Sequence, residues 1–194
     1  MENLLPGTTL VCPPGKEQAA FSVLEPVFAV SGGGLGLSQV SELTGLPPSS
    51  IQNWVKRGWV ARPVAKKYDE IKVARILLIN LLRSTMQMEQ IANLLAYVNG
   101  SVNDRGDDSM PDPRLYSLVS AAMFRLKAEG HIGRETLVSL IEEYRRELPE
   151  TVPDAPERLL NALEIILLDA EAAMRIKEAD EKYRRLMVNE EADR

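Results

Sequence analysis

The residues best suited to chemistry in this sequence are basic side chains gathered in one segment. Positions 51–85 carry eight Lys and Arg but two acidic residues, a net charge of +6 in a chain whose net charge is −5. The basic residues are Lys56, Arg57, Arg62, Lys66, Lys67, Lys72, Arg75 and Arg83. Basic residues clustered on one face are typical of proteins that bind a polyanion. Charge runs are also common on ordinary solvated surfaces. The pattern in which these charges lie must therefore distinguish a polyanion-binding surface from an ordinary one.

The scarcity of histidine and cysteine argues against catalysis and against metal binding. Cys12 and His131 are the single members of their kinds, so the chain can form neither an internal disulfide nor a site of several such ligands. No nucleophile or base is implied beside either residue. The acidic stretch 100–112 lacks the spacing of a calcium-binding loop. We therefore expect no enzymatic activity, no cofactor and no metal.

Signals for membrane targeting are also missing from the sequence. No basic residue precedes an apolar stretch in residues 1–11. The longest apolar stretch, residues 76–82, is far shorter than the roughly 20 residues that a membrane span needs. We expect a cytoplasmic protein that does not bind membranes.

Glycine and proline breaks, followed by hydrophobic residues at helical spacing, predict a leader and then a pair of short helices. Residues 1–36 are predicted to be an irregular leader that packs on the body. One short helix is predicted to be capped by Ser38 and ended by Gly45, and a second to cover residues 48–57. Such a pair is typical of a helix-turn-helix. Residues 59–68 suit a small hairpin, because they are too short and proline-interrupted for a helix.

The rest of the chain predicts further helices, so the fold class is mostly α in two parts. Helices at 70–82 and 88–99 complete a first unit, 37–99, and residues 100–112 form an acidic, turn-rich linker that ends in a helix cap at Asp112. Residues 113–194 are predicted to form a helical domain for dimerisation or sensing. Its last helix has apolar residues at helical spacing: Leu159, Leu160, Leu163, Ile166, Leu167, Ala170, Met174 and Ile176. These suit either a homodimer through the C-terminal helices or packing on the chain's own helices.

Residues 37–95 resemble the MerR-type winged helix of bacterial transcription regulators. The likeness lies in four segments: LSQVSELTGL at 37–46, IQNWVKRGWV at 51–60, KKYD at 66–69 and MEQI at 88–91. The segment NWVKRG at 53–58, with residues 63–64 and 66–68, looks closer still to a bacterial family of unknown function that has the same head and a helical tail. This resemblance covers most of the chain from about Leu24. It implies a MerR-like winged helix-turn-helix followed by an α-helical C-terminal domain.

The resemblance also implies a DNA-binding surface. In MerR-type heads the second helix enters the major groove and the wing holds the phosphate backbone, which corresponds here to a recognition helix at 48–57 and a basic wing at 62–68. The candidate DNA-binding residues are Ser49, Ser50, Gln52, Asn53, Lys56, Arg57, Arg62, Lys66, Lys67 and Tyr68. Gln and Asn can pair with adenine edges, whereas Lys neutralises phosphates. We therefore expect a transcriptional regulator whose partner is duplex DNA; the sequence identifies no small-molecule effector.

A second interpretation is a protein-interaction or adaptor module that keeps the winged-helix shape without binding DNA. The acidic net charge favours it. So does the second helix, because MerR-type proteins usually have an arginine followed by two aromatic residues where this sequence has Gln52, Asn53 and Trp54. Direct measurement of DNA binding separates the two interpretations.

Overall fold

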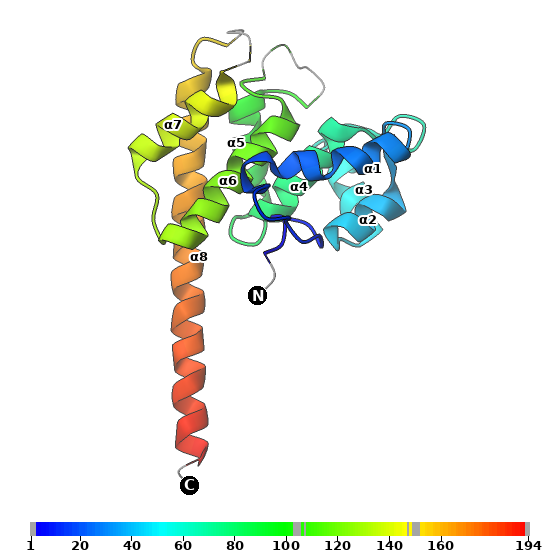
Figure 1. Ribbon diagram of the computed structural model, residues 1–194. Helices are drawn as coiled ribbons and strands as arrows, with labels where there is room; N and C mark the ends of the chain where they lie inside the picture. The colour runs from blue at the N-terminus through cyan, green and yellow to red at the C-terminus, as the bar shows by residue number, and fades with distance from the viewer. Residues whose placement is uncertain (1–2, 103–105, 107, 147, 149–151, 193–194) are drawn as a thin grey trace.

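A computed structural model describes residues 3–102, 106, 108–146, 148 and 152–192 of the chain, with side chains in the last helix described as far as Met187. The described part contains eight α-helices, one 3-10 helix and a two-stranded sheet, so the predicted mostly α class is confirmed (Figure 1). The elements are η1 (Glu17–Val23), α1 (Glu25–Val30), β1 (Leu35–Gly36), α2 (Leu37–Thr44), α3 (Pro48–Lys56), β2 (Lys67–Tyr68), α4 (Glu70–Leu82), α5 (Met88–Asn99), α6 (Asp112–Glu129), α7 (Arg134–Arg145) and α8 (Ala155–Ala192).

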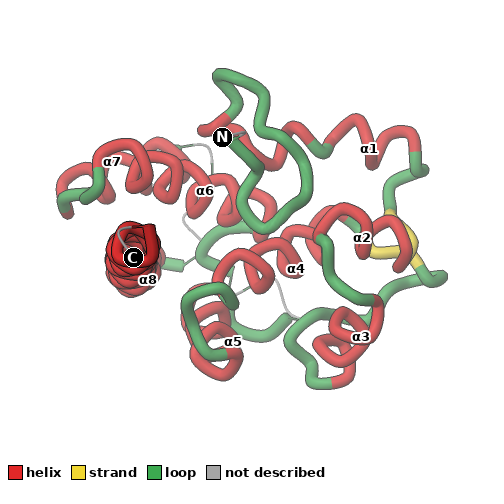
Figure 2. Tube along the Cα trace, turned by 90° about the horizontal axis from the view of Figure 1, so that it is seen from below, coloured by secondary structure: helices red, strands yellow, loops and turns green. Residues whose placement is uncertain are grey.

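Helix α4 lies at the centre of the molecule, with other helices on several sides (Figure 2). Every residue from Lys72 to Ile79 is buried, as expected of a helix that is apolar around most of its circumference. The side chain of Asp69 caps the helix by accepting a hydrogen bond from Lys72 N at 3.0 Å. Helices α2, α5 and α6 all pack against α4, so its position sets theirs.

The leader, for which irregular structure was predicted, contains η1 and α1. Phe21, Leu24 and Phe28 are buried, and the ring of Phe21 contacts those of Phe28 and Tyr116 with centroids 5.9 and 6.1 Å apart. Burial of these large apolar side chains favours the helical turns that carry them. The leader is therefore part of the core, and η1 packs against α6.

Hydrogen bonds from distant tyrosines fix the backbone of the leader. Tyr116 Oη donates to Pro6 O at 2.7 Å, and Tyr144 Oη donates to Gln18 O. Burial raises the pKa of Tyr144 to about 12, so its hydroxyl keeps the proton that it donates at neutral pH. Gly7 has a φ of 72° and lies so close to α4 that a Cβ would stand 2.7 Å from Leu77 O, which leaves no room for a side chain.

The segment predicted to be a linker, residues 100–112, ends inside the core. Asp112 was predicted to be a helix cap, but Pro111 occupies that position and Asp112 is buried beside Arg75. Arg75 Nε donates to Asp112 Oδ2 at 2.9 Å, and Asn99 Nδ2 donates to Asp112 Oδ1 at 3.0 Å. A buried carboxylate needs such partners to offset its lost hydration. The two predicted parts of the chain consequently share one hydrophobic core.

Helix α8 packs against α5, α6 and α7 over its first part and then extends away from the body (Figure 1). Leu163 and Leu167 are buried against the chain's own helices, whereas Ile176 is exposed. Packing within the chain therefore accounts for the first part of the predicted apolar stripe. Within the described residues, no helix is both long enough and apolar enough to cross a membrane.

The Arg75–Asp112 pair yields a stability prediction. Asp112→Ala leaves the Arg75 guanidinium buried without its carboxylate, so we expect the free energy of unfolding to fall by about 3–5 kcal/mol. Urea denaturation followed by circular dichroism measures the loss. The matched control is Glu129→Ala, which removes an exposed ion pair with Arg125 and should cost less than about 0.5 kcal/mol. Equal losses in the two variants would contradict the assigned role of the buried pair.

Candidate nucleic-acid interface

Helices α2 and α3 form a tight pair joined by residues 45–47. Gly45 ends α2 with a φ of 69°, a left-handed conformation that favours glycine. Thr44 Oγ1 accepts from Leu46 N at 3.2 Å, and Asn80 Nδ2 of α4 donates to Thr44 O at 2.9 Å. These bonds hold the turn against α4 and so fix the direction in which α3 leaves it.

The exposed face of α3 brings together four of the predicted DNA-binding residues. Ile51 and Trp54 point into the core, which leaves the opposite side of the helix to solvent. Exposed side chains at i, i+3, i+4 and i+7 share that side: Ser49, Gln52, Asn53 and Lys56. Ser50 is half-buried and lies off this face. The helix thus presents one polar and basic surface, nine residues long from Pro48 to Lys56.

A groove beside the end of α3 gathers further basic residues. Its lining includes Lys56 from α3, Arg62 from the following loop and Lys72 from α4. The ammonium of Lys72 is bonded to the Asp69 carboxylate, so that cation is already neutralised. Lys56 and Arg62 are exposed and can contact an anion at the groove.

The predicted hairpin is a very small one. Val64 and Lys67 exchange both of their backbone hydrogen bonds, at 3.1 and 2.8 Å, and the two residues between them, Ala65 and Lys66, have φ values of 48° and 63°. Two successive positive φ angles define a type I′ turn. Strand β2 then pairs antiparallel with β1, which places Leu35 opposite Tyr68. The turn therefore holds Lys66 at an exposed tip.

Two predicted phosphate-binding residues of the hairpin are engaged within the protein. Tyr68 is only 3% exposed, and burial raises the pKa of its phenol; its ring belongs to the core because β1 and α4 pack against β2. Tyr68 is therefore left out of the surface described below. Lys67 is exposed, but its Nζ donates to Ser31 O at 2.8 Å, which ties the hairpin to the glycine-rich segment before β1.

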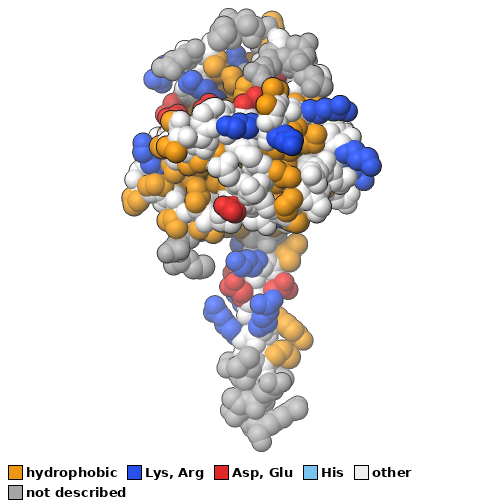
Figure 3. Space-filling model, turned by 90° about the vertical axis from the view of Figure 1, so that its right-hand side faces the viewer, with side chains coloured by type: hydrophobic (Ala, Val, Ile, Leu, Met, Phe, Trp, Pro, Cys, Tyr) orange, Lys and Arg blue, Asp and Glu red, His pale blue; other side chains and the backbone are white. Residues whose placement is uncertain are grey.

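Of the eight basic residues in 51–85, five remain as an exposed group near α3. Lys72 and Arg75 are buried in ion pairs, and Arg83 lies at the far end of α4, bonded to Asn80. We call the remaining five the basic surface: Lys56, Arg57, Arg62, Lys66 and Lys67. Figure 3 views the end of the molecule that α1, α2 and α3 form, where Lys and Arg side chains spread over the upper half.

Two features near this surface were not predicted from the sequence: the cation–π contact of Arg57 and the burial of Arg75. The Arg57 guanidinium lies 5.2 Å from the centroid of the Trp59 ring, a cation–π contact, so Arg57 is held on the indole. Arg75 was counted as part of the basic run but is 5% exposed. Its position on α4, a helix that is apolar around most of its circumference, was the available signal, because a charge buried on such a helix requires a buried partner.

A family model matches the part of the chain that carries the basic surface. Residues 32–117 match the family described as Domain of unknown function (DUF1836). "Uncharacterized protein YkrK" of Bacillus subtilis (strain 168) is 34% identical over 76 residues, which make up 37% of this chain. The match spans 33% of that relative's length, so the chain covers about a third of it. No solved structure matches the chain. These matches support a family of unknown function.

The hairpin turn yields the second prediction. Positive φ costs a residue such as alanine about 1 kcal/mol, whereas asparagine tolerates this conformation better. We expect Ala65→Asn to raise the free energy of unfolding by several tenths to about 1 kcal/mol, measured by urea denaturation. Ala128→Asn, at an exposed position in α6, is the control and should lower stability by a few tenths of a kcal/mol. A loss at both positions would refute the assigned turn geometry.

Proposed function

We propose that this protein is a DNA-binding transcriptional regulator with a MerR-like winged helix-turn-helix head. In this proposal α3 enters the major groove, and the hairpin at residues 64–67 acts as the wing. The observation that carries the proposal is the exposed face of α3, where Ser49, Gln52 and Asn53 lie beside Lys56, the first residue of the basic surface.

The chemistry of this face suits DNA. The amides of Gln52 and Asn53 each offer a donor and an acceptor, which is the pairing that an adenine edge presents in the major groove. Lys56 and Arg62 flank the groove at the end of the helix, and Lys66 stands at the tip of the turn. Cations at these positions would hold the phosphate backbone and fix the register of the helix without reading sequence.

The third prediction tests DNA binding directly. Fluorescence anisotropy with pooled random duplex DNA should show binding at 50 mM salt, because phosphate contacts dominate non-specific affinity. If roughly six phosphates are neutralised, affinity should fall by about 10³-fold or more between 50 and 200 mM salt. The variant Lys56→Glu/Arg62→Glu/Lys66→Glu should bind at least about 100-fold more weakly at 50 mM salt.

The control variant changes the net charge by the same amount as the triple variant, but at positions outside the basic surface. Lys16, Lys127 and Arg146 are exposed and outside the basic surface, so replacing all three with Glu should weaken binding far less. Equal loss in both variants would mean that overall charge, not this surface, governs binding. No binding by the wild type at 50 mM salt would refute the proposal and favour the adaptor interpretation, in which the same surface binds a protein.

The proposal includes a dimer, because two-fold DNA sites are bound by two-fold proteins. The projecting part of α8 offers a second apolar stripe, distinct from the buried one. Its members recur at alternating intervals of four and three residues: Ala172, Ile176, Ala179, Tyr183 and Leu186. All five are exposed, with Ile176 and Tyr183 at 65% and 62%. Such spacing is that of a coiled-coil seam, and within the described residues nothing covers it.

The charges beside the seam favour a parallel arrangement. Arg175 and Lys182 precede the seam residues Ile176 and Tyr183, and Asp180 follows Ala179, so basic and acidic side chains lie on opposite flanks. In a parallel coiled coil opposite flanks face each other, which brings Arg175 of one chain near Asp180 of the other. In an antiparallel pair the same flanks meet, and Arg175 would face Lys182.

The fourth prediction tests the dimer and its orientation. Light scattering coupled to size-exclusion chromatography should give twice the chain mass of 21.6 kDa, and Ile176→Glu/Leu186→Glu should give a monomer, because two charges enter the seam. Lys177→Glu/Arg184→Glu, off the seam on the same helix, is the control and should remain dimeric. Arg175→Glu should weaken a parallel dimer and strengthen an antiparallel one. A monomeric wild type would eliminate the dimer.

A further inference from the structure

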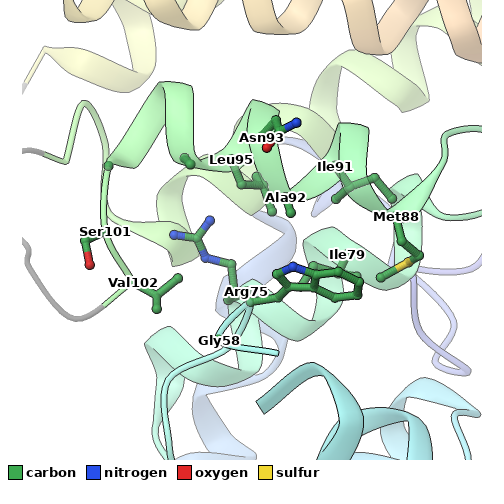
Figure 4. Close-up of a pocket in the computed structure, with 13 residues that line it drawn as sticks. Gly58, Arg75, Ile79, Met88, Ile91, Ala92, Asn93, Leu95, Ser101 and Val102 are labelled. Carbon is green, nitrogen blue, oxygen red and sulfur yellow. The ribbon is translucent and has the colours of Figure 1, made fainter. Parts of the chain in front are cut away.

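A pocket behind α3 combines an indole, aliphatic side chains and a buried guanidinium. It has a volume of about 360 Å³ and lies between the residues that follow α3, helix α4 and helix α5 (Figure 4). The residues that matter for its chemistry are Trp59, Arg75, Ile79, Ile91, Ala92 and Leu95. This size and mixture of apolar walls with one charged group are typical of small-molecule sites.

Arg75 supplies a charged group to the pocket, whose lining also includes the polar residues Asn93 and Ser101. Its Nε donates to Asp112 at 2.9 Å, which uses one of the five N–H donors of the planar guanidinium. In the described part of the chain the two terminal nitrogens have no protein hydrogen-bond partner, and the guanidinium points into the pocket at the end away from Met88 (Figure 4). Both terminal nitrogens can therefore donate to an acceptor bound in the pocket.

The other walls suit a flat apolar group. Ile79, Ile91 and Leu95 are almost fully buried, and Trp59 adds an indole, the side chain with the largest aromatic surface. Ala92 of α5 also lines the pocket, and its small side chain keeps the space beside these residues open. The apolar walls and the guanidinium are therefore within reach of one small molecule.

We propose that this pocket binds a small aromatic carboxylate. The carboxylate accepts two N–H bonds from the terminal nitrogens of Arg75, in the bidentate geometry that guanidinium groups favour, and the ring packs against Trp59 and α5. Both oxygens of Asp112 already accept hydrogen bonds from Arg75 and Asn99. Because Gly58 and Trp59 lie in the turn that follows α3, an occupant contacts the segment after the proposed DNA-facing helix; its link to DNA binding rests on the proposed function, whereas ligand binding does not.

Isothermal titration calorimetry of the full chain, without DNA, tests the proposal. The probe is 1-naphthoate, and its neutral analogue 1-naphthalenemethanol has the same ring and nearly the same size. We expect saturable, one-to-one binding of 1-naphthoate that quenches tryptophan fluorescence, and at least about tenfold weaker binding of the alcohol, because a hydrogen bond to a charged group contributes more than a neutral one. Absence of saturable 1-naphthoate binding, or equal affinity for the two compounds, would overturn the proposal.

Two variants locate the site. Arg75→Lys keeps a positive charge beside Asp112 but removes the planar fork, so it should weaken 1-naphthoate at least about tenfold. Ala92→Leu leaves the ion pair intact and fills the space, so it should abolish binding, whereas Ala128→Leu, an exposed alanine in α6, should bind as the wild type does. If circular dichroism shows that Arg75→Lys does not fold, the affinities of Ala92→Leu for 1-naphthoate and of the wild type for the neutral analogue test the proposal instead. Wild-type affinity in Ala92→Leu would refute this pocket as the site.

Discussion

The buried pairing of Arg75 with Asp112 constrains the centre of the molecule. Each charge is costly to bury, so each must find the other, and this fixes the first turn of α6 against the middle of α4. Asn99 donates to Asp112 and to Met110 O at 2.7 Å, which brings the end of α5 to the same point. Three helices and the connection between α5 and α6 therefore share one polar junction inside an apolar core.

The polar contacts of α4 also position α5, α2 and the leader around it. With α5 held at its C-terminal end, its apolar residues face α4 and leave the space that Trp59 and Ala92 line. At the other side of α4, Asn80 holds Thr44 of α2 and Gly7 of the leader through its amide, at 2.9 and 2.8 Å. The outward direction of α3 thus depends on polar contacts of α4, a helix that itself contacts little solvent. Rigid internal support of this kind lets a short surface helix keep a fixed orientation.

Local sequence signals predicted the helices well, and long-range contacts explain what they missed. Gly45, Pro48 and Asp69 correctly marked helix ends, because caps and turns are decided by neighbouring residues. The predicted cap Ser38 was wrong, since α2 begins at Leu37 with Gly36 as its N-cap. The helices in the leader depend on the contact of Phe21 with Tyr116, 95 positions away, which no local pattern reveals. Asp112 was predicted to be a helix cap because its buried partner, Arg75, is also distant in the sequence. On the candidate surface, helical spacing correctly placed Gln52, Asn53 and Lys56 outward, whereas the burial of Tyr68 depends on packing against α4.

The attachment of the leader has a consequence for synthesis on the ribosome. Phe21 and Gln18 emerge first, yet their partners Ser117 and Tyr144 lie 96 and 126 positions later. At translation rates of about 5–20 residues per second, the leader waits roughly 5–25 s before those partners are made. During that interval Phe21, Leu24 and Phe28, all buried in the finished protein, have no permanent place to pack. The nascent chain therefore exposes an aromatic segment that is open to aggregation until α6 forms and packs against it.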